Sequence, residues 1–157
     1  MALYEPTLFA LLDAETPPPN DADGIRTTVA EAVAALGAAN PDGAAACFID
    51  YWMGAGAWAR MPASRQGPIA AAIGNVRGWA GALLNEPTAL AAFSALNVPV
   101  LYMMGEDSPV SSRGVGRLLT RTLPQVQVVE FEGVGHMGPI THAQVVNQAI
   151  SRFLEQL

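Results

Sequence analysis

The feature that most constrains the fold is a histidine on a glycine-rich turn, in residues 132–139 (EGVGHMGP). Before this segment, residues 126–131 (VQVVEF) alternate apolar and polar side chains, which predicts a strand. After it, apolar residues recur at helical spacing between positions 146 and 157, which predicts a closing helix. His136 is therefore expected at the carboxyl end of a strand, the edge at which open α/β sheets bind ligands.

The glycines at positions 133 and 135 allow the backbone to bend sharply and to approach another group closely. An imidazole held in such a turn can act as a general base near neutral pH. The local residues are equally consistent with a simple glycine-rich turn that exposes its histidine to solvent. The rest of the chain has to decide between these two interpretations.

Two further apolar runs predict strands. Residues 98–104 (VPVLYMM) form a continuous apolar run that ends in Gly105 and acidic residues, as expected of a buried strand. A short strand at the start of the chain is ended by Pro6. Apolar residues at helical spacing between the last two strands predict an amphipathic helix with a solvent-exposed arginine face. The chain is therefore assigned to the α/β class, with three parallel strands near residues 2–4, 100–104 and 126–131.

The segment between the first two strands is predicted to be helical. A rigid, proline-rich linker comes first, at residues 17–21. The spacing of apolar residues then predicts one helix over residues 23–37 and another, after an Asn-Pro-Asp start signal, over residues 41–53. A glycine-containing third helix is expected from residue 64 or 68 to residue 84, and a short fourth helix over residues 87–96.

In this order, the elements resemble the carboxyl-terminal half of the α/β-hydrolase fold. In that family the last-but-one strand leads to a loop that often carries the catalytic acid, and the last strand leads to the catalytic histidine. Residues 1–6 (MALYEP) resemble the family's sixth strand, after which relatives insert a helical cap over the active site. The resemblance divides the chain into a core segment 1–12, a helical cap region 13–97 and a carboxyl-terminal core segment 98–157.

The resemblance implies a catalytic histidine and an acid that orients it. His136 matches the family's histidine in position and in its glycine-histidine setting, whereas His142 falls at the start of the closing helix. The acid is either Glu5, at the end of the strand that resembles the sixth, or Asp107. Because the place at which most relatives carry their acid holds Ser108, Glu5 is preferred over Asp107.

The nucleophile that the resemblance implies is missing from the sequence. Family members carry it in a Gly-x-Ser-x-Gly elbow between a strand and a helix, and this motif does not occur here. Because the elbow precedes the sixth strand in the family, the nucleophile is expected to come from sequence outside this chain. The sequence contains no phosphate-binding glycine loop and no metal-ligand spacing, so neither a cofactor nor a metal ion is predicted.

Several aromatic side chains lie in the predicted cap. Trp52 and Trp58, with Met137 beside the histidine, are the candidate substrate-binding residues, because they could line a pocket for an acyl group or a ring. For any single aromatic residue of the cap, packing between helices is the more frequent role. The substrate is expected to be small, apolar and ester-like.

Composition excludes several other classes. Of 157 residues, 51% are hydrophobic and 14% are charged, which excludes a disordered chain. The net charge of −6 and the scattered basic residues give no indication of a nucleic-acid or anionic-membrane surface. The single Cys47 cannot form an internal disulfide. The sequence starts without the basic flank and apolar core of a signal peptide, so a soluble cytoplasmic protein is predicted.

The predicted function is that of the carboxyl-terminal part of an α/β-hydrolase-type enzyme, which hydrolyses an ester or a related bond with His136 as general base. The alternative is a catalytically inactive, truncated hydrolase that acts as an apolar-ligand-binding or interaction domain. In the family, the strand that residues 1–6 resemble pairs with the elbow strand, so here this strand would expose an open sheet edge. Self-association through that edge is therefore expected of the isolated chain.

Overall fold

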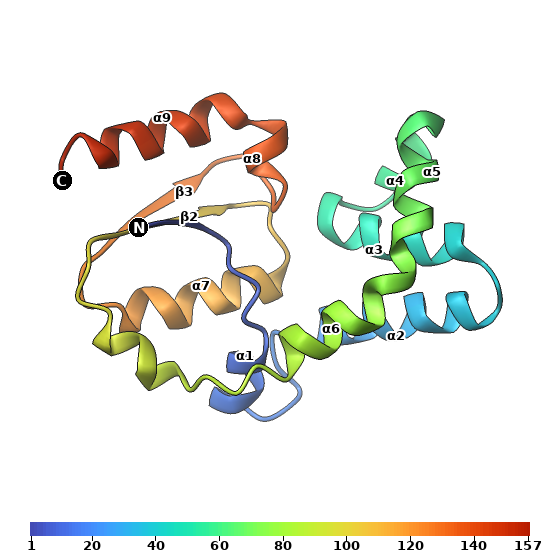
Figure 1. Ribbon diagram of the computed structural model, residues 1–157, viewed down its shortest axis with the longest axis horizontal. Coiled ribbons are helices and arrows are strands. Elements are labelled where there is room, and N and C mark those ends of the chain that lie inside the picture. Colours follow the sequence, from blue (N-terminus) through green and yellow to red (C-terminus); the bar gives the residue numbers. More distant parts are fainter.

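The sheet of this protein has three parallel strands, in a computed structural model that describes residues 1–157. The strands are β1 (Ala2–Tyr4), β2 (Val100–Gly105) and β3 (Val126–Phe131), in the spatial order β1-β2-β3 (Figure 1). Both strand pairs are parallel, and all three strands lie where the sequence predicts them. The α/β class is therefore confirmed.

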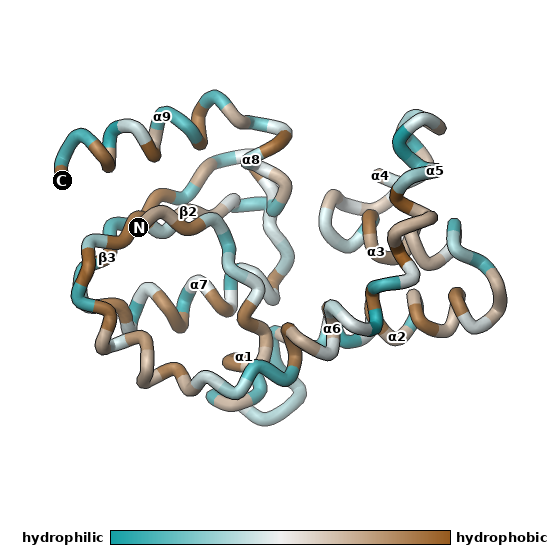
Figure 2. The backbone as a smooth tube through the Cα atoms, in the orientation of Figure 1, coloured by the Kyte–Doolittle hydropathy of each residue, from teal (hydrophilic) through white to brown (hydrophobic).

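The central strand β2 is buried on both faces. Its side chains alternate between a cluster shared with α7 (Val110–Thr122), which Tyr102 enters, and a cluster shared with α9 (Ala143–Leu154), which Leu101 enters. The two helices lie on opposite sides of the sheet (Figure 1), and hydrophobic residues are concentrated along β2 and on the side of α9 that faces it (Figure 2). A strand covered on both faces needs apolar side chains at successive positions, which explains the continuous apolar run in the sequence.

A group of helices, called the cap below, extends to one side of this core (Figure 1). Its members are α2 (Asp23–Gly37), α3 (Pro41–Met53), α4 (Ala57–Arg60), α5 (Ala63–Ala72), the 3-10 helix η1 (Ile73–Asn75) and α6 (Val76–Leu84). Within the cap, α2, α3, η1 and α6 share one cluster of buried side chains: Ala32, Ala44, Ala45, Ile73 and Val76. The cap thus has a small apolar core of its own.

The helices α2 and α3 have the bounds that the sequence predicts. Asn40 caps α3, since its side-chain oxygen accepts a hydrogen bond from the backbone N–H of Gly43 at 2.9 Å. Pro41 occupies the first turn, where its missing N–H is no loss. Gly54, with a φ of 89°, ends the helix in a conformation that side chains disfavour. These start and stop signals place Trp52 in the last turn of α3.

The prediction of one continuous helix up to residue 84 is wrong. The segment is divided into α5, η1 and α6, and a further short helix, α4, precedes them. Gly74 lies within η1, and glycine weakens a continuous helix. The tighter turn of η1 places Ile73 and Val76 in the buried cluster of the cap, where 2% and 1% of their surfaces are exposed. At the break between α5 and α6, the chain therefore packs against α2 and α3.

Three short segments complete the fold: α1 (Ala10–Glu15), the 3-10 helix η2 (Leu90–Ala95) and α8 (Gly138–Thr141). The segment η2 replaces the short helix that the sequence predicts over residues 87–96. Both α1 and η2 lie against α7, so the stretches before and after the cap pack onto the core. None of the helices combines the length and the apolar character needed to cross a membrane.

Two contacts fix the last turn of α3 against the core. The Tyr51 hydroxyl is hydrogen-bonded to the Ser111 hydroxyl, in the first turn of α7, at 2.6 Å. Trp52 stacks on Phe9, with the ring centroids 6.1 Å apart. Because Phe9 follows β1 and Ser111 follows β2, this part of the cap lies next to the carboxyl ends of the strands.

Candidate active site

The centre of the candidate site is a hydrogen-bonded pair of side chains, Glu5 and His136. Glu5 directly follows β1 and His136 lies on the loop after β3, so the parallel sheet brings together two residues 131 positions apart. The carboxylate oxygen Oε2 of Glu5 lies 2.7 Å from the imidazole nitrogen Nδ1. The Glu5 side chain is 0% exposed, whereas 19% of the His136 side chain is exposed. The pair is thus closed to solvent on the acid side and open on the imidazole side.

The second carboxylate oxygen of Glu5 is bonded as well. Its Oε1 accepts a hydrogen bond from the backbone N–H of Gly105, at the end of β2, at 2.7 Å. A buried carboxylate is unfavourable unless its oxygens are paired, and here both are. Only glycine fits at position 105, because a Cβ there would lie 2.0 Å from the carbonyl oxygen of Val134 on the histidine loop.

The backbone of Glu5 adopts an uncommon conformation. Its φ is 41°, in the left-handed region, and Ala39 is the only other non-glycine residue with a positive φ. The backbone N–H of Glu5 still donates to the carbonyl oxygen of Met103 at 3.1 Å, so the turn comes immediately after the last bond of the β1–β2 pair. Strained residues of this kind persist only where the surroundings hold them, and they concentrate at functional sites.

Tyr4 holds the histidine loop from the sheet side. Its hydroxyl donates a hydrogen bond to the carbonyl oxygen of Gly135 at 2.7 Å. Gly138 leaves room for this hydroxyl, since a Cβ at that position would lie 2.2 Å from it. Burial, and then the nearby Glu5 carboxylate, raise the pKa of Tyr4 to about 12. Tyr4 therefore stays a neutral hydrogen-bond donor at physiological pH.

The other candidate acid, Asp107, does not contact His136. Its side chain is exposed and forms no ion pair or hydrogen bond with the imidazole, whose Nδ1 is bonded to Glu5 alone. The backbone N–H of Asp107 donates to the carbonyl oxygen of Val134 at 3.0 Å. Ser108, at the place that the resemblance assigns to the usual acid, is buried and its hydroxyl has no partner. Of the two carboxylates that the sequence leaves open, the structure therefore pairs Glu5 with the histidine.

An apolar pocket of about 330 Å³ opens beside the imidazole. It is lined by nine residues, seven of which are hydrophobic: Thr7, Phe48, Ile49, Trp52, Met53, Trp79, Leu83, His136 and Met137. The hydrophobic residues come mainly from α3 and α6 of the cap, whereas Thr7 follows β1 and Met137 belongs to the histidine loop. The cap and the core thus form a pocket between them, of the size that small-molecule sites have.

Two of the three candidate substrate-binding residues lie at this pocket. Trp52 also stacks on the imidazole of His136, with ring centroids 4.2 Å apart and a tilt of 33°, and Met137 lines the wall. Trp58 lies elsewhere: its side chain packs against the buried cluster of the cap, and its backbone N–H donates to the Asp50 carboxylate at 2.8 Å. The structure does not bring Trp58 to the histidine.

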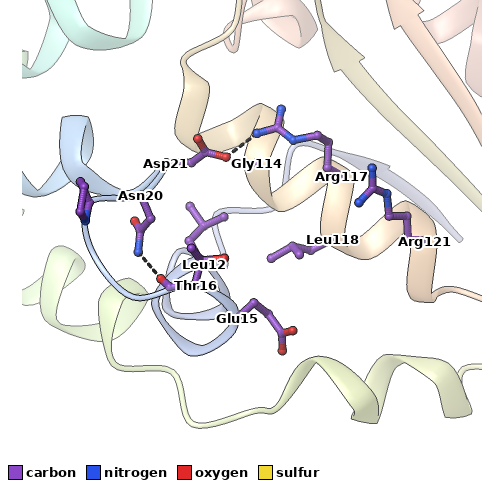
Figure 3. Close-up of a pocket in the computed structure, with 10 residues that line it drawn as sticks. Leu12, Glu15, Thr16, Asn20, Asp21, Gly114, Arg117, Leu118 and Arg121 are labelled. Atoms are coloured by element: carbon purple, nitrogen blue, oxygen red, sulfur yellow. Dashed lines mark hydrogen bonds and ion pairs between the residues drawn. The ribbon is translucent and has the colours of Figure 1, made fainter.

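A separate hollow of about 330 Å³ lies away from the histidine, between the linker before α2 and helix α7 (Figure 3). Its polar side chains bond mainly to one another and to the backbone. Arg117, from the exposed arginine face of α7, is ion-paired with Asp21, and Asn20 donates to the carbonyl oxygen of Thr16 at 2.6 Å. These contacts hold the linker against α7, and they give Arg117 a structural role.

The geometry around His136 suits proton transfer at its second nitrogen, Nε2. Because a carboxylate accepts hydrogen bonds, the contact with Glu5 assigns the proton to Nδ1 and leaves the lone pair on Nε2. Such an imidazole can take a proton from a nucleophile, and the adjacent carboxylate stabilises the imidazolium that forms. No serine or cysteine side chain is bonded to the ring. No group of three His, Cys, Asp or Glu side chains is placed to hold a metal ion.

Comparison with known proteins bears on the fold. No family model matches the sequence, and no curated protein matches it. The crystal structure of a proline iminopeptidase from Mycobacterium smegmatis matches the chain with a TM-score of 0.51 and 19% sequence identity. The match covers 96% of this chain and 52% of that one. The chain therefore shares the fold of about half of that structure, which has an α/β-hydrolase fold. It spans about half the length of the solved structure, and the likeness extends to the fold alone.

Several residues of this partial α/β-hydrolase fold support the histidine without having been singled out from the sequence. The sequence patterns assign Tyr4 only to the first strand and Gly105 only to the end of the second strand. A glycine that ends a buried strand does signal a close backbone approach, so Gly105 could have been found. His142 lies where the sequence predicts, exposed at the start of α9, with its Nδ1 2.9 Å from the Thr141 hydroxyl.

Proposed function

We propose that this chain is the carboxyl-terminal, cap-bearing part of an α/β-hydrolase-type enzyme that hydrolyses an ester or a related bond. His136 acts as the general base, and Glu5 orients the ring and stabilises the imidazolium. The nucleophile comes from sequence outside this chain. The observation that carries the proposal is the 2.7 Å contact between the buried Glu5 carboxylate and the partly exposed imidazole of His136.

The form of this pair favours catalysis over a purely structural role. A buried ion pair adds little net stability, and apolar side chains of similar size often replace one without loss. Glu5 is nevertheless fully buried and has a positive φ. Its two carboxylate oxygens are hydrogen-bonded to His136 and to Gly105. An imidazole held through Nδ1, with Nε2 directed away from the acid, is the arrangement that general-base catalysis requires.

The pocket beside His136 supports a small, apolar, ester-like substrate. Apart from His136, its lining contains no charged side chain, so a neutral acyl group or ring fits it better than a charged group. Of the three candidate substrate-binding residues from the sequence, Trp52 and Met137 border this pocket, and Met137 is the proposed substrate contact. The matched structure is named as an iminopeptidase, so amide substrates belong in the same test as esters.

Restoring the nucleophile tests the proposal directly. The chain is combined with a polypeptide that carries a Gly-x-Ser-x-Gly elbow, taken from the coding sequence immediately upstream, and hydrolysis of p-nitrophenyl butyrate is measured. We expect turnover from the combination and none from the chain alone. In the combination, His136→Ala should lower kcat by at least two orders of magnitude. The matched control His142→Ala should leave kcat unchanged, and equal losses from both variants would refute the role of His136.

The second candidate function is a catalytically inactive domain that binds an apolar ligand. The observation that favours it is the pocket lining, in which seven of nine residues are hydrophobic. A neutral fluorescent naphthylamine can be titrated into the purified chain to measure binding. Saturable binding that is weakened by Trp79→Ala, together with no turnover in any combination with an elbow-bearing polypeptide, would establish this function instead.

The same proposal includes a partner at the sheet edge. β1 has β2 as its only neighbour, so its other side has backbone N–H and C=O groups free to pair. We propose the elbow-bearing polypeptide as the occupant of this edge and expect the chain alone to self-associate. Sedimentation of the purified chain at micromolar concentration checks this, and a monodisperse monomer would contradict it.

The cytoplasmic location of the protein also stays a prediction.

A further inference from the structure

We propose that Trp52 is a positioning residue for His136, through which the cap holds the general base in its working orientation. The inference rests on the proposed function only in taking His136 as the base. It gives Trp52 a role different from the substrate contact that the sequence suggests. The indole of Trp52 lies on the imidazole face, with ring centroids 4.2 Å apart and a tilt of 33°.

The burial of Trp52 argues for this role. Only 9% of the residue is exposed, so little of the indole remains for a ligand. Other aromatic rings pack around it: Tyr51 lies edge-on at a centroid distance of 5.0 Å, and Phe9 and Phe48 each lie at 6.1 Å. The indole is therefore fixed by its neighbours, and it presents a rigid surface to the histidine.

The end of α3 that carries Trp52 is itself held on two sides. On one side, the Tyr51 hydroxyl is bonded to the Ser111 hydroxyl at 2.6 Å. On the other, the Asp50 carboxylate accepts hydrogen bonds from the backbone N–H groups of Gly56 and Trp58, at 2.9 and 2.8 Å, which closes the turn after α3. A displacement of the cap would therefore move Trp52 relative to His136.

The contact completes the restraint of the imidazole. The Glu5 bond holds one nitrogen of the ring but leaves the ring plane some freedom to tilt, because a single hydrogen bond fixes only one ring atom. An indole against one face removes this freedom and keeps water from that face. Its π-electrons also attract the cation that forms when His136 takes a proton. The imidazole is therefore held at its edge by Glu5, which belongs to the core, and on one face by Trp52, which belongs to the cap.

Proton NMR of the purified full chain tests the contact without any turnover. The chain contains two histidines, so the exposed His142 serves as an internal reference and His142→Gln assigns the signals. We expect the carbon-bound ring protons of His136 to be shifted upfield by the indole ring current. We also expect a far-downfield signal for the Nδ1 proton that is bonded to Glu5. Ring protons with equal shifts in both histidines would overturn the proposal.

Matched variants separate positioning from general stability. Trp52→Leu should abolish the upfield shift and broaden the Nδ1 signal through faster exchange with water, whereas Trp52→Phe should keep both in part. Trp58→Leu removes a similar apolar side chain from the cap, away from the histidine, and should change neither signal. An unchanged Nδ1 signal in Trp52→Leu, or its loss in Trp58→Leu, would contradict a positioning role.

Kinetics of the chain combined with its elbow-bearing partner give the second readout. Trp52→Leu should lower kcat about 3- to 30-fold with KM nearly unchanged, and Trp52→Phe should recover most of the loss. A raised KM with kcat unchanged would return Trp52 to a substrate-binding role. If the wild-type combination shows no turnover, the proposed function fails while the NMR result still decides the contact.

Discussion

The carboxylate of Glu5 and the backbone N–H of Gly105 lie 100 positions apart in the chain and 2.7 Å apart in space. This bond links the ends of β1 and β2, and its other partner, His136, belongs to the loop after β3. Strand β2, which is followed by the other candidate acid, Asp107, thus contributes a backbone hydrogen-bond donor to Glu5. All three strands of the sheet are needed to hold the pair.

Replacing Gly105 with alanine should destabilise the protein. The new Cβ would lie 2.0 Å from the Val134 carbonyl oxygen and 2.6 Å from its carbon, both backbone atoms that cannot move without shifting the histidine loop. We expect the free energy of unfolding to fall by about 2–4 kcal/mol. Urea unfolding followed by circular dichroism measures it, and a change below about 0.5 kcal/mol would show that the loop yields freely.

The matched control for this substitution should stabilise the chain. Gly78 lies in the interior of α6, is exposed and has nothing within 4 Å of an added Cβ. Alanine restricts the unfolded chain and favours the helix, so Gly78→Ala should raise the free energy of unfolding by about 0.5–1 kcal/mol. The same urea titration measures both variants. A loss of stability would indicate that α6 is not helical at this position in solution.

Replacing Glu5 with glutamine should impair catalysis more than folding. The amide can still accept the Gly105 bond, but its NH2 group would donate to Nδ1 of His136 and move the imidazole proton to Nε2. In the chain combined with its elbow-bearing partner, we expect kcat to fall roughly 10²- to 10⁴-fold. The matched control is Asp107→Asn, which should change kcat by less than about twofold. A larger loss from Asp107→Asn would make Asp107 the acid.

The three tyrosines of the chain, Tyr4, Tyr51 and Tyr102, should not ionise at their ordinary pKa of 10.0 while the protein is folded. Burial is the largest cause of the raised pKa in each of them, and the Glu5 carboxylate adds to it for Tyr4 and Tyr102. Ultraviolet absorbance of phenolate, recorded as pH rises, should therefore show no step at pH 10. A normal step there would contradict the burial of these rings.

The same shifts determine how stability depends on pH. Above pH 10.0 the unfolded chain loses tyrosine protons that the folded chain keeps, for Tyr4 up to a pKa of about 12. The unfolded state then binds fewer protons than the folded state, so the free energy of unfolding falls as pH rises through this window. Below pH 10 this contribution to stability is fully present. Tyr4→Phe should reduce the decline, which urea midpoints between pH 8 and pH 11 would reveal.

Much of the fold could be predicted from the sequence because its signals are local. Alternating apolar and polar residues, or continuous apolar runs, locate the three strands. Asn40 and Gly54 mark the two ends of α3. The position of His136 after the last strand follows from the same patterns. The resemblance to the α/β-hydrolase fold also limited the candidate acid to Glu5 and Asp107, each of which follows a strand of the sheet.

Only the tertiary structure shows which of those two carboxylates contacts His136. The choice depends on the positive φ of Glu5, on the approach of Gly105 to the histidine loop and on the exposure of Asp107. None of these can be read from the local sequence, because they depend on how distant segments pack together, as in the bond between Glu5 and Gly105.

The same distinction applies to the cap. The sequence shows that the predicted cap carries aromatic residues, but which of them reaches His136 depends on how the cap helices pack against the core. That arrangement placed Trp52 on the imidazole and Trp58 inside the cap. Local patterns determine which elements form, whereas the packing of distant elements determines which side chains meet, because only packing sets distances across the fold.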